Sequence, residues 1–206
     1  MKSLLKLLSF LTELIFPLGD TAKLVREVTP ELFGRVTLPA LTSCGYTGLL
    51  PYRHRIVRAV IIEAKYHKNK RAISLLAQTL TEYLSALAED TYPFDTKDFV
   101  IIPIPLGPKR LHERGYNQVE EVIKTANIHY EPNLLVRTRE TAPQTTLPKG
   151  ERTQNVRNAF RAVGPFTTSV TYVVLDDVTT TGATLHEAVT VLEEQGIHPI
   201  ALALAY

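Results

Sequence analysis

Two apolar runs near the C-terminus, joined by one helical segment, constrain the fold more than any other feature of this chain. The first run, TYVVLDD, begins at residue 171, and the second, HPIALALAY, ends at residue 206. Both are apolar enough to be buried strands, and LHEAVTVLEEQ between them is typical of a helix that ends near Gly196. A strand, a helix and a strand at this spacing form a parallel βαβ unit with a right-handed crossover.

Further elements extend this unit into a larger sheet. FVIIPIP, which starts at Phe99, is a short apolar run closed by prolines and predicts a strand buried on both faces. Helical periodicity predicts two helices between residues 56 and 87, separated by a polar break at 67–71, and a third helix in GYNQVEEVIKTAN. Residues 134–137 predict a second short strand, and residues 138–155 predict a long polar loop. We therefore predict an α/β fold with a doubly wound, mostly parallel sheet and helices on both faces.

Residues 1–50 predict an N-terminal helical or irregular appendage to a domain that spans residues 51–206. One helical face of this region contains Leu4, Leu7, Leu8, Leu11, Leu14 and Ile15, and Pro17 ends that helix. This apolar stretch is shorter than the roughly 20 residues that cross a bilayer. We expect a helix that docks on its own domain rather than a membrane-surface anchor, because the polar face has too few cations. Residues 19–51 predict irregular structure or short strands.

The run that begins at residue 171 leads into two adjacent acids and a series of small residues. The acids are Asp176 and Asp177, and the small residues are Val178, Thr179, Thr180, Thr181, Gly182, Ala183 and Thr184. Ligands of parallel sheets bind beyond the carboxyl ends of the strands. Backbone N–H groups, the helix dipole and threonine hydroxyls there would bind a phosphate, and Gly182 permits a close approach or a positive φ. Ordinary helix capping explains one acid and one threonine, but not the whole series.

The two acids suit another part of the same ligand, because carboxylates repel a phosphate. They would accept hydrogen bonds from a vicinal diol, and they could help to hold Mg²⁺ directly or through water. A ribose 5-phosphate carries both the phosphate and the diol. VVLDDVTTTGAT resembles the 5-phosphoribosyl-1-pyrophosphate (PRPP) loop of the type I phosphoribosyltransferases. This resemblance implies that Asp176 and Asp177 contact the ribose diol, and that residues 179–184 hold the 5-phosphate.

A basic cluster, IPIPLGPKRLHERGYNQ, follows the strand at Phe99. We expect Lys109, Arg110 and Arg114 in a short loop before a helix that starts near Tyr116. Such a loop suits a multiply charged anion such as pyrophosphate, although a solvated basic turn explains the cluster equally well.

The cluster also resembles the signature of the ComF family, a branch of the type I phosphoribosyltransferases. EAKYHKNKRAISLLAQTL and APQTTLPKGERTQNVRNAFRA agree with that family as well, so the resemblance covers residues 50–206. By this resemblance, the pyrophosphate contacts are Arg114, Gly115, Arg110 and Lys65. A mobile loop that closes over the ligand would contain Gln144, Arg152 and Asn155.

The cysteine content departs from the family pattern. Many ComF proteins carry a four-cysteine zinc module before this domain, whereas Cys44 is the only cysteine in these 206 residues. One cysteine excludes that zinc site and an internal disulfide, and it fits a reduced, cytoplasmic protein. The net charge of +2 gives no chain-wide prediction of nucleic-acid binding.

The sequence leaves the activity open between a transferase and a binding protein. In a transferase, a nucleophile would displace pyrophosphate from PRPP with Mg²⁺, and no side-chain nucleophile is needed, so we expect His67 and His112 to be surface residues. Because the ComF family is linked to DNA uptake, the protein could instead sense PRPP or a nucleotide, or bind single-stranded DNA. A strip for that DNA would contain Lys65, Lys68, Lys70, Arg71, Lys109, Arg110 and Arg114. A purine-salvage or orotate-type enzyme fits the PRPP loop but not RLHERGYNQ, and no acceptor is predicted.

Overall fold

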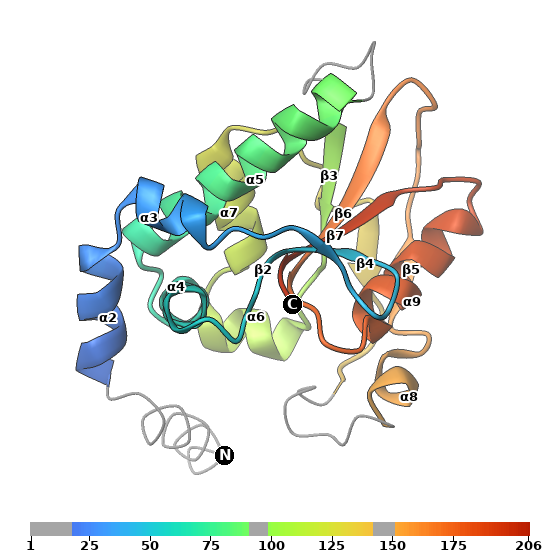
Figure 1. Ribbon diagram of the computed structural model, residues 1–206. Coiled ribbons are helices and arrows are strands. Elements are labelled where there is room, and N and C mark those ends of the chain that lie inside the picture. The colour runs from blue at the N-terminus through green and yellow to red at the C-terminus, as the bar shows by residue number, and fades with distance from the viewer. Residues whose placement is uncertain (1–17, 91–98, 142–150) are drawn as a thin grey trace.

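A mixed five-stranded sheet forms the centre of the computed structural model, which describes residues 18–90, 99–141 and 151–206 (Figure 1). The strand order is β1-β2-β7-β6-β3. The strands are β1 (Ala40–Leu41), β2 (Thr47–Leu50), β3 (Phe99–Pro103), β6 (Thr171–Val178) and β7 (Ile200–Ala205). Only the β1–β2 pair is antiparallel, and β2, β7, β6 and β3 run parallel to one another. The predicted βαβ unit is confirmed, because β6 and β7 are parallel neighbours joined by a helix.

Helices cover both faces of this sheet, and two apolar cores lie between them and the strands (Figure 1). The first core contains α4 (Arg55–Tyr66), α5 (Lys70–Asp90) and α7 (Gln118–Ala126), and the second contains α9 (Ala183–Glu193). Successive strand residues alternate between the cores, because side chains of a β-strand point to opposite faces in turn. In β6, Val173 and Leu175 pack in the first core and Val174 packs in the second. The α/β class predicted from the sequence is therefore confirmed.

A second, two-stranded antiparallel sheet packs in the second core. It consists of β4 (Leu135–Arg137) and β5 (Phe160–Ala162), with Val136 opposite Arg161. The strand at 134–137 agrees with the prediction, but β5 was not predicted. Its three residues are too few to establish a period of two in the sequence.

The N-terminal region is more ordered than the sequence predicts. Helices α2 (Leu18–Glu27) and α3 (Pro30–Arg35) replace the irregular structure expected after residue 19. Thr29 caps α3 through its hydroxyl, which accepts the Leu32 N–H at 3.2 Å, and Pro30 occupies the first turn. Residues 40–50, assigned to the predicted appendage, supply β1 and β2 of the central sheet. The helix predicted at residues 4–15 lies outside the described residues.

Two predicted loops contain short helices. The cationic segment after β3 forms α6 (Pro108–Arg114), with a proline at its start and Gly115 in the left-handed region at its end (φ 78°). Proline at the first position and glycine after the last are ordinary helix signals, but the basic residues between them obscured the short helix. The predicted polar loop at 138–155 contains the start of α8 (Arg152–Val156).

Polar contacts, one of them buried, fasten α2 to the sheet-covering helices. The Thr21 hydroxyl donates to Glu63 Oε1 of α4 at 2.7 Å, and both side chains are buried. Arg71, at the start of α5, donates through Nε to the Val25 carbonyl at 3.0 Å and through Nη2 to the Val28 carbonyl. These carbonyls lie at the C-terminal end of α2, where a cation complements the helix dipole. None of the helices in the described ranges is long and apolar enough to cross a membrane.

We predict that Arg71→Met lowers the free energy of unfolding by about 1–3 kcal/mol, because two charge-assisted hydrogen bonds to α2 are lost. Urea denaturation followed by circular dichroism measures the change. Lys70→Met, which alters the exposed neighbouring cation, is the matched control and should leave the stability within about 0.5 kcal/mol of the wild type. Equal effects of the two substitutions would contradict the structural role of Arg71.

Candidate functional site

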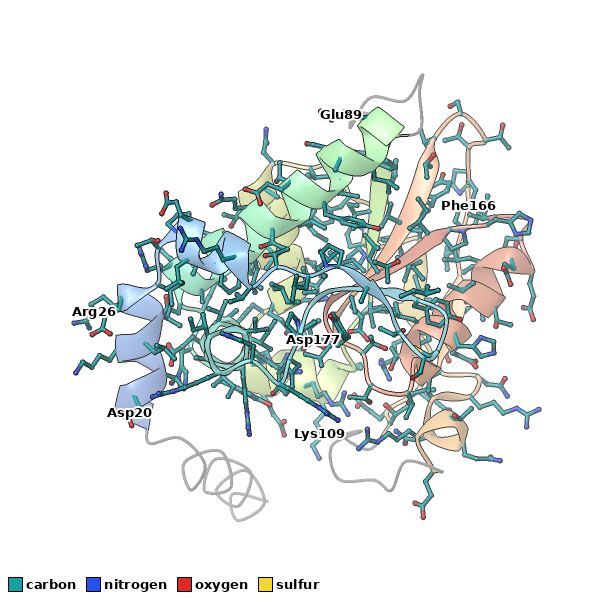
Figure 2. The ribbon with its side chains drawn as sticks, in the orientation of Figure 1. Asp20, Arg26, Glu89, Lys109, Phe166 and Asp177 are labelled. Carbon is teal, nitrogen blue, oxygen red and sulfur yellow. The ribbon has the colours of Figure 1, made fainter. Side chains whose placement is uncertain are left out.

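The carboxyl ends of the parallel strands bring the predicted site residues to one edge of the sheet. β3 leads into α6, and β6 leads into the loop at residues 178–182 and then α9. The start of α7 reaches the same edge, because the Asn117 amide donates to the carbonyl of Ile104, just beyond β3. In Figure 2, Asp177 lies in the interior of the molecule and Lys109 of α6 lies at its periphery. The two motifs singled out in the sequence, the acids after β6 and the basic cluster after β3, therefore lie at the same edge of the sheet.

Asp177 is the most heavily engaged side chain at this edge. It is only 8% exposed, and its Oδ2 accepts hydrogen bonds from Lys65 Nζ of α4 and from Gln118 Nε2 of α7, the latter at 2.7 Å. Its Oδ1 accepts the Val178 N–H at 2.8 Å. Burial alone would raise the pKa of Asp177, but the charge and hydrogen bond of Lys65 hold it below the ordinary value. Asp177 is therefore a buried, ionised carboxylate with a cationic partner.

Asp176 has a different environment because it points to the opposite face of β6. Its Oδ1 accepts the Asp177 N–H at 2.8 Å, and Arg137 of β4 contributes a positive charge on that face. Burial, and then the negative charge of Asp177, raise the pKa of Asp176 to about 7. Both carboxylates fold forward onto the next backbone N–H, so both remain at the carboxyl end of the strand. Neighbouring acids with opposite pKa shifts are typical of functional sites.

The loop that follows the two acids places backbone groups and threonine hydroxyls near the start of α9. Gly182 has a φ of 71°, and a Cβ there would lie 2.6 Å from both Cβ and Sγ of Cys44. The positive φ predicted for Gly182 is thus confirmed, and the close contact that the structure shows there is with Cys44. The Thr180 hydroxyl accepts a hydrogen bond from Arg152 Nη1 at 2.8 Å. Among the described residues, the buried Thr181 hydroxyl oxygen has no hydrogen-bond partner.

The remaining residues of this loop fix its course. Thr179 is buried, and its N–H donates to the Ala205 carbonyl of β7 at 2.9 Å. Val178 completes β6, while Ala183 and Thr184 form the first turn of α9. The first N–H groups of a helix have no partner within the helix, and they carry the positive end of its dipole. An anion placed here would meet amides, a hydroxyl and a favourable potential.

The basic residues of the second motif lie near the acids but are held by other groups. Arg114 donates to Gln118 Oε1, and its guanidinium lies 5.6 Å from the centre of the Tyr66 ring. Arg110 Nη2 donates to the Thr141 carbonyl at 3.2 Å, and burial followed by the charge of Arg114 lowers its pKa. The Lys109 N–H donates to Glu140 Oε1 at 2.8 Å. Arg114 thus reaches Asp177 through one intervening amide.

The sequence predicted no role for three consecutive residues of the RGYNQ segment, although all three belong to the family signature. The Tyr116 hydroxyl donates to the Ala64 carbonyl of α4 at 2.8 Å, Asn117 caps α7, and Gln118 binds Asp177. They connect α4, β3 and β6 at one point. Their position along the chain could have indicated a role, because they come directly after a strand and a helix end. Polar side chains at such a position lie at the edge of the sheet where ligands bind. Cys44 and Tyr46 were also missed, and the Tyr46 hydroxyl lies 3.1 Å from His186 Nδ1 of α9.

The predicted mobile-loop residues are only partly described. Arg152 donates to the Thr180 hydroxyl, the Asn155 carbonyl accepts from Arg139 Nη2 at 3.1 Å, and Gln144 lies outside the described residues. The predicted DNA strip does not form one exposed row. Lys65 points to Asp177 and Arg71 binds the end of α2, while Lys68 Nζ lies 3.0 Å from Glu121 Oε2.

The donors at this edge suit a hard cation that arrives with a phosphorylated ligand. Within the three described segments, no group of three His, Cys, Asp or Glu side chains is placed to hold a metal ion. Mg²⁺ commonly binds one or two carboxylates together with water and substrate phosphates, so such a group is not required. A cation beside Asp176 would offset the burial and the negative charge of Asp177, which together raise the pKa of Asp176. A shallow groove of about 380 Å³ between α5 and α7 contains none of these residues.

Several curated proteins are similar to about half of the chain or more, among them the following three. Competence protein ComFC of Streptococcus pneumoniae is 32% identical over 114 residues, which are 55% of this chain and 50% of that protein. Competence protein F of Haemophilus influenzae is 37% identical over 106 residues (48% and 46%), and DNA utilization protein YhgH of Escherichia coli K12 is 33% identical over 100 residues (47% and 44%). The chain spans about half the length of the curated relatives it matches. These relatives confirm the predicted similarity to the ComF family, although no family model matches the chain.

We predict that Asp177→Asn destabilises the protein in a pH-dependent way. Because the pKa of Asp177 is lower in the folded than in the unfolded state, its stabilising contribution is present above pH ~4 and is lost as the pH falls through the folded value. The free energy of unfolding of the variant should lie about 1–3 kcal/mol below that of the wild type at pH 7, and the difference should shrink in acid. Urea denaturation between low and neutral pH measures it, with the exposed Glu89→Gln as control. A difference that does not vary with pH would refute the ionised pair.

Proposed function

We propose that this protein binds PRPP with Mg²⁺ at the carboxyl edge of β6, in a domain of the type I phosphoribosyltransferase-like class. The 5-phosphate would bind the loop at residues 179–184 and the start of α9. The ribose diol would bind Asp176 and Asp177, and the pyrophosphate would face Lys65, Arg110, Arg114 and Gly115. The carboxylates would also take part in holding Mg²⁺.

One observation carries this proposal: the same edge presents a cation group, a carboxylate pair and a loop with an unpartnered hydroxyl. Asp177 binds Lys65 directly and Arg114 through Gln118, and the loop that contains the unpartnered Thr181 hydroxyl follows Asp177 in the chain. A PRPP molecule has the same sequence of groups, with a diol between two phosphorylated ends. A simple capped helix needs neither the buried acid with its lysine nor the arginine next to it.

The chemistry open to this site is displacement of pyrophosphate from the anomeric carbon of PRPP. The positive charge that develops on the sugar would be stabilised by the nearby carboxylates, and Lys65 and Arg114 would bind the leaving pyrophosphate. When bound, Mg²⁺ would neutralise part of the charge on that group. Asp177 would keep Lys65 oriented before the ligand arrives. Catalysis by this route needs orientation and charge rather than a protein nucleophile.

The names of the relatives favour a cellular role in competence or the use of external DNA. We infer that PRPP binding, with or without transfer to an acceptor, serves that process here. A transferase releases pyrophosphate when the right acceptor is present, whereas a sensor of PRPP binds it without turnover. A panel of nucleobases and other nucleophiles, assayed for pyrophosphate release, separates the two forms of the proposal.

We predict that isothermal titration shows PRPP binding that requires Mg²⁺, and that Thr181→Val weakens it about tenfold by removing one donor to the 5-phosphate. The same change should leave the free protein as stable as the wild type or about 1 kcal/mol more stable, because an unpaired buried hydroxyl is replaced by a methyl group. Thr190→Val is the matched control, because Thr190 lies in the following helix α9 and its hydroxyl donates to the His186 carbonyl. No heat of binding for the wild type would refute the proposed function.

Direct binding of single-stranded DNA is the second candidate function, which the names of the relatives support. We predict weak binding of a labelled oligonucleotide at physiological salt, because several predicted contacts are already paired and the net charge is only +2. Fluorescence anisotropy over a range of salt concentrations measures it. Tight binding with a steep salt dependence, lost in Lys109→Ala with Arg110→Ala but kept in Asp176→Asn, would favour the DNA function instead.

A further inference from the structure

The side chain of Gln118 is buried between the two charged parts of the site. It is 4% exposed and occupies the first position of α7. Its Nε2 donates to Asp177 Oδ2 at 2.7 Å, and its Oε1 accepts from Arg114 Nη1. One amide therefore joins the carboxylate at the end of β6 to the guanidinium at the end of α6.

Only an uncharged group with a donor at one end and an acceptor at the other can make both contacts. A glutamate at this position would accept from Arg114 but would face the Asp177 carboxylate. A basic residue would donate to Asp177 but repel Arg114. Apolar side chains of similar size would leave both buried groups without that partner, which is costly in a medium of low dielectric constant. The amide orientation is thus fixed by the charges on its two sides.

The backbone around Gln118 is itself held in place. Asn117 accepts the Val119 N–H through Oδ1 at 3.0 Å and donates through Nδ2 to the Ile104 carbonyl at 3.1 Å. The Tyr116 hydroxyl donates to the Ala64 carbonyl one residue before Lys65. Lys65, the other partner of Asp177, is therefore tied to the same anchored segment. A displacement of Gln118 would be transmitted to Arg114 and Asp177 rather than absorbed by a flexible loop.

We propose that Gln118 is a positioning residue that sets the separation between the pyrophosphate-binding arginine and the ribose-binding carboxylate. This inference rests on the proposed function. A ligand that carries both a diol and a pyrophosphate spans that separation, whereas pyrophosphate or ribose 5-phosphate alone does not. Gln118 therefore selects for the intact PRPP molecule over either of its parts, without touching any of them.

The test is isothermal titration of three ligands, each with Mg²⁺, into the wild-type protein, Gln118→Leu and Gln118→Glu. In both variants we expect the Kd for PRPP to rise about tenfold or more, and the Kd values for pyrophosphate and ribose 5-phosphate to rise less than about threefold. Gln118→Glu keeps the shape of the side chain and the contact to Arg114, so a role in packing alone predicts wild-type affinity for it. Gln78→Leu removes an exposed glutamine of α5, bound to Glu82, and is the matched control.

A double-mutant cycle with Arg114→Ala tests whether Gln118 acts through the arginine. In the Arg114→Ala background, Gln118→Leu should change the PRPP affinity by much less than tenfold, because the group that it positions is gone. Thermal unfolding of each variant shows that the titrated protein is folded.

The outcomes separate this inference from the proposed function. If the wild type does not bind PRPP, the proposed function fails and the role of Gln118 fails with it. If the wild type binds PRPP but Gln118→Leu binds all three ligands like the wild type, or weakens all three equally, only the positioning role is refuted. Additive effects of Gln118→Leu and Arg114→Ala would refute it as well.

Discussion

A buried carboxylate at the end of a parallel strand requires a counter-charge, and the pairing of Asp177 with Lys65 supplies it. Lys65 comes from α4, 112 residues earlier in the chain, and Gln118 from α7 adds a second donor to the same oxygen. Without these partners an ionised side chain at 8% exposure would be strongly unfavourable. The helix layer over the first core is therefore fixed relative to the sheet at the point where the ligand is proposed to bind.

The need to pair the buried Asp177 carboxylate also explains the positions of the polar residues in the RGYNQ segment. Gly115 ends α6 in a left-handed conformation, and the next three side chains then reach α4, β3 and β6 in turn. A segment with so many fixed contacts can present Arg114 with little conformational freedom. Pre-organisation of this kind lowers the entropic cost of binding a charged ligand. The contact between Cys44 and Gly182 has a comparable effect on the loop before α9, because the segment between β1 and β2 packs against that loop.

The long, regular elements could be predicted from the sequence, and the short ones could not. The strands at Phe99 and residue 171 and the helices on either side of residues 67–69 follow from apolar periodicity over many residues. Helix α6 was missed because its seven residues are mostly basic and contain no apolar stripe. The segment at Asp177 stood out in the sequence because acids, glycine and small residues after a strand have few structural explanations, whereas the basic cluster with Arg114 stood out through its resemblance to the ComF signature. Gln118 was missed because a single glutamine carries no pattern of its own.

The sequence by itself determined the α/β class, the βαβ unit and the similarity to the ComF family, since each depends on residues that are close in the chain. Only the tertiary structure decided which groups meet. It turned Lys65 toward Asp177, placed Gln118 between Asp177 and Arg114, and turned Arg71 away to bind α2. These outcomes depend on burial and on distances between segments that are far apart in sequence, and neither quantity can be calculated from local periodicity.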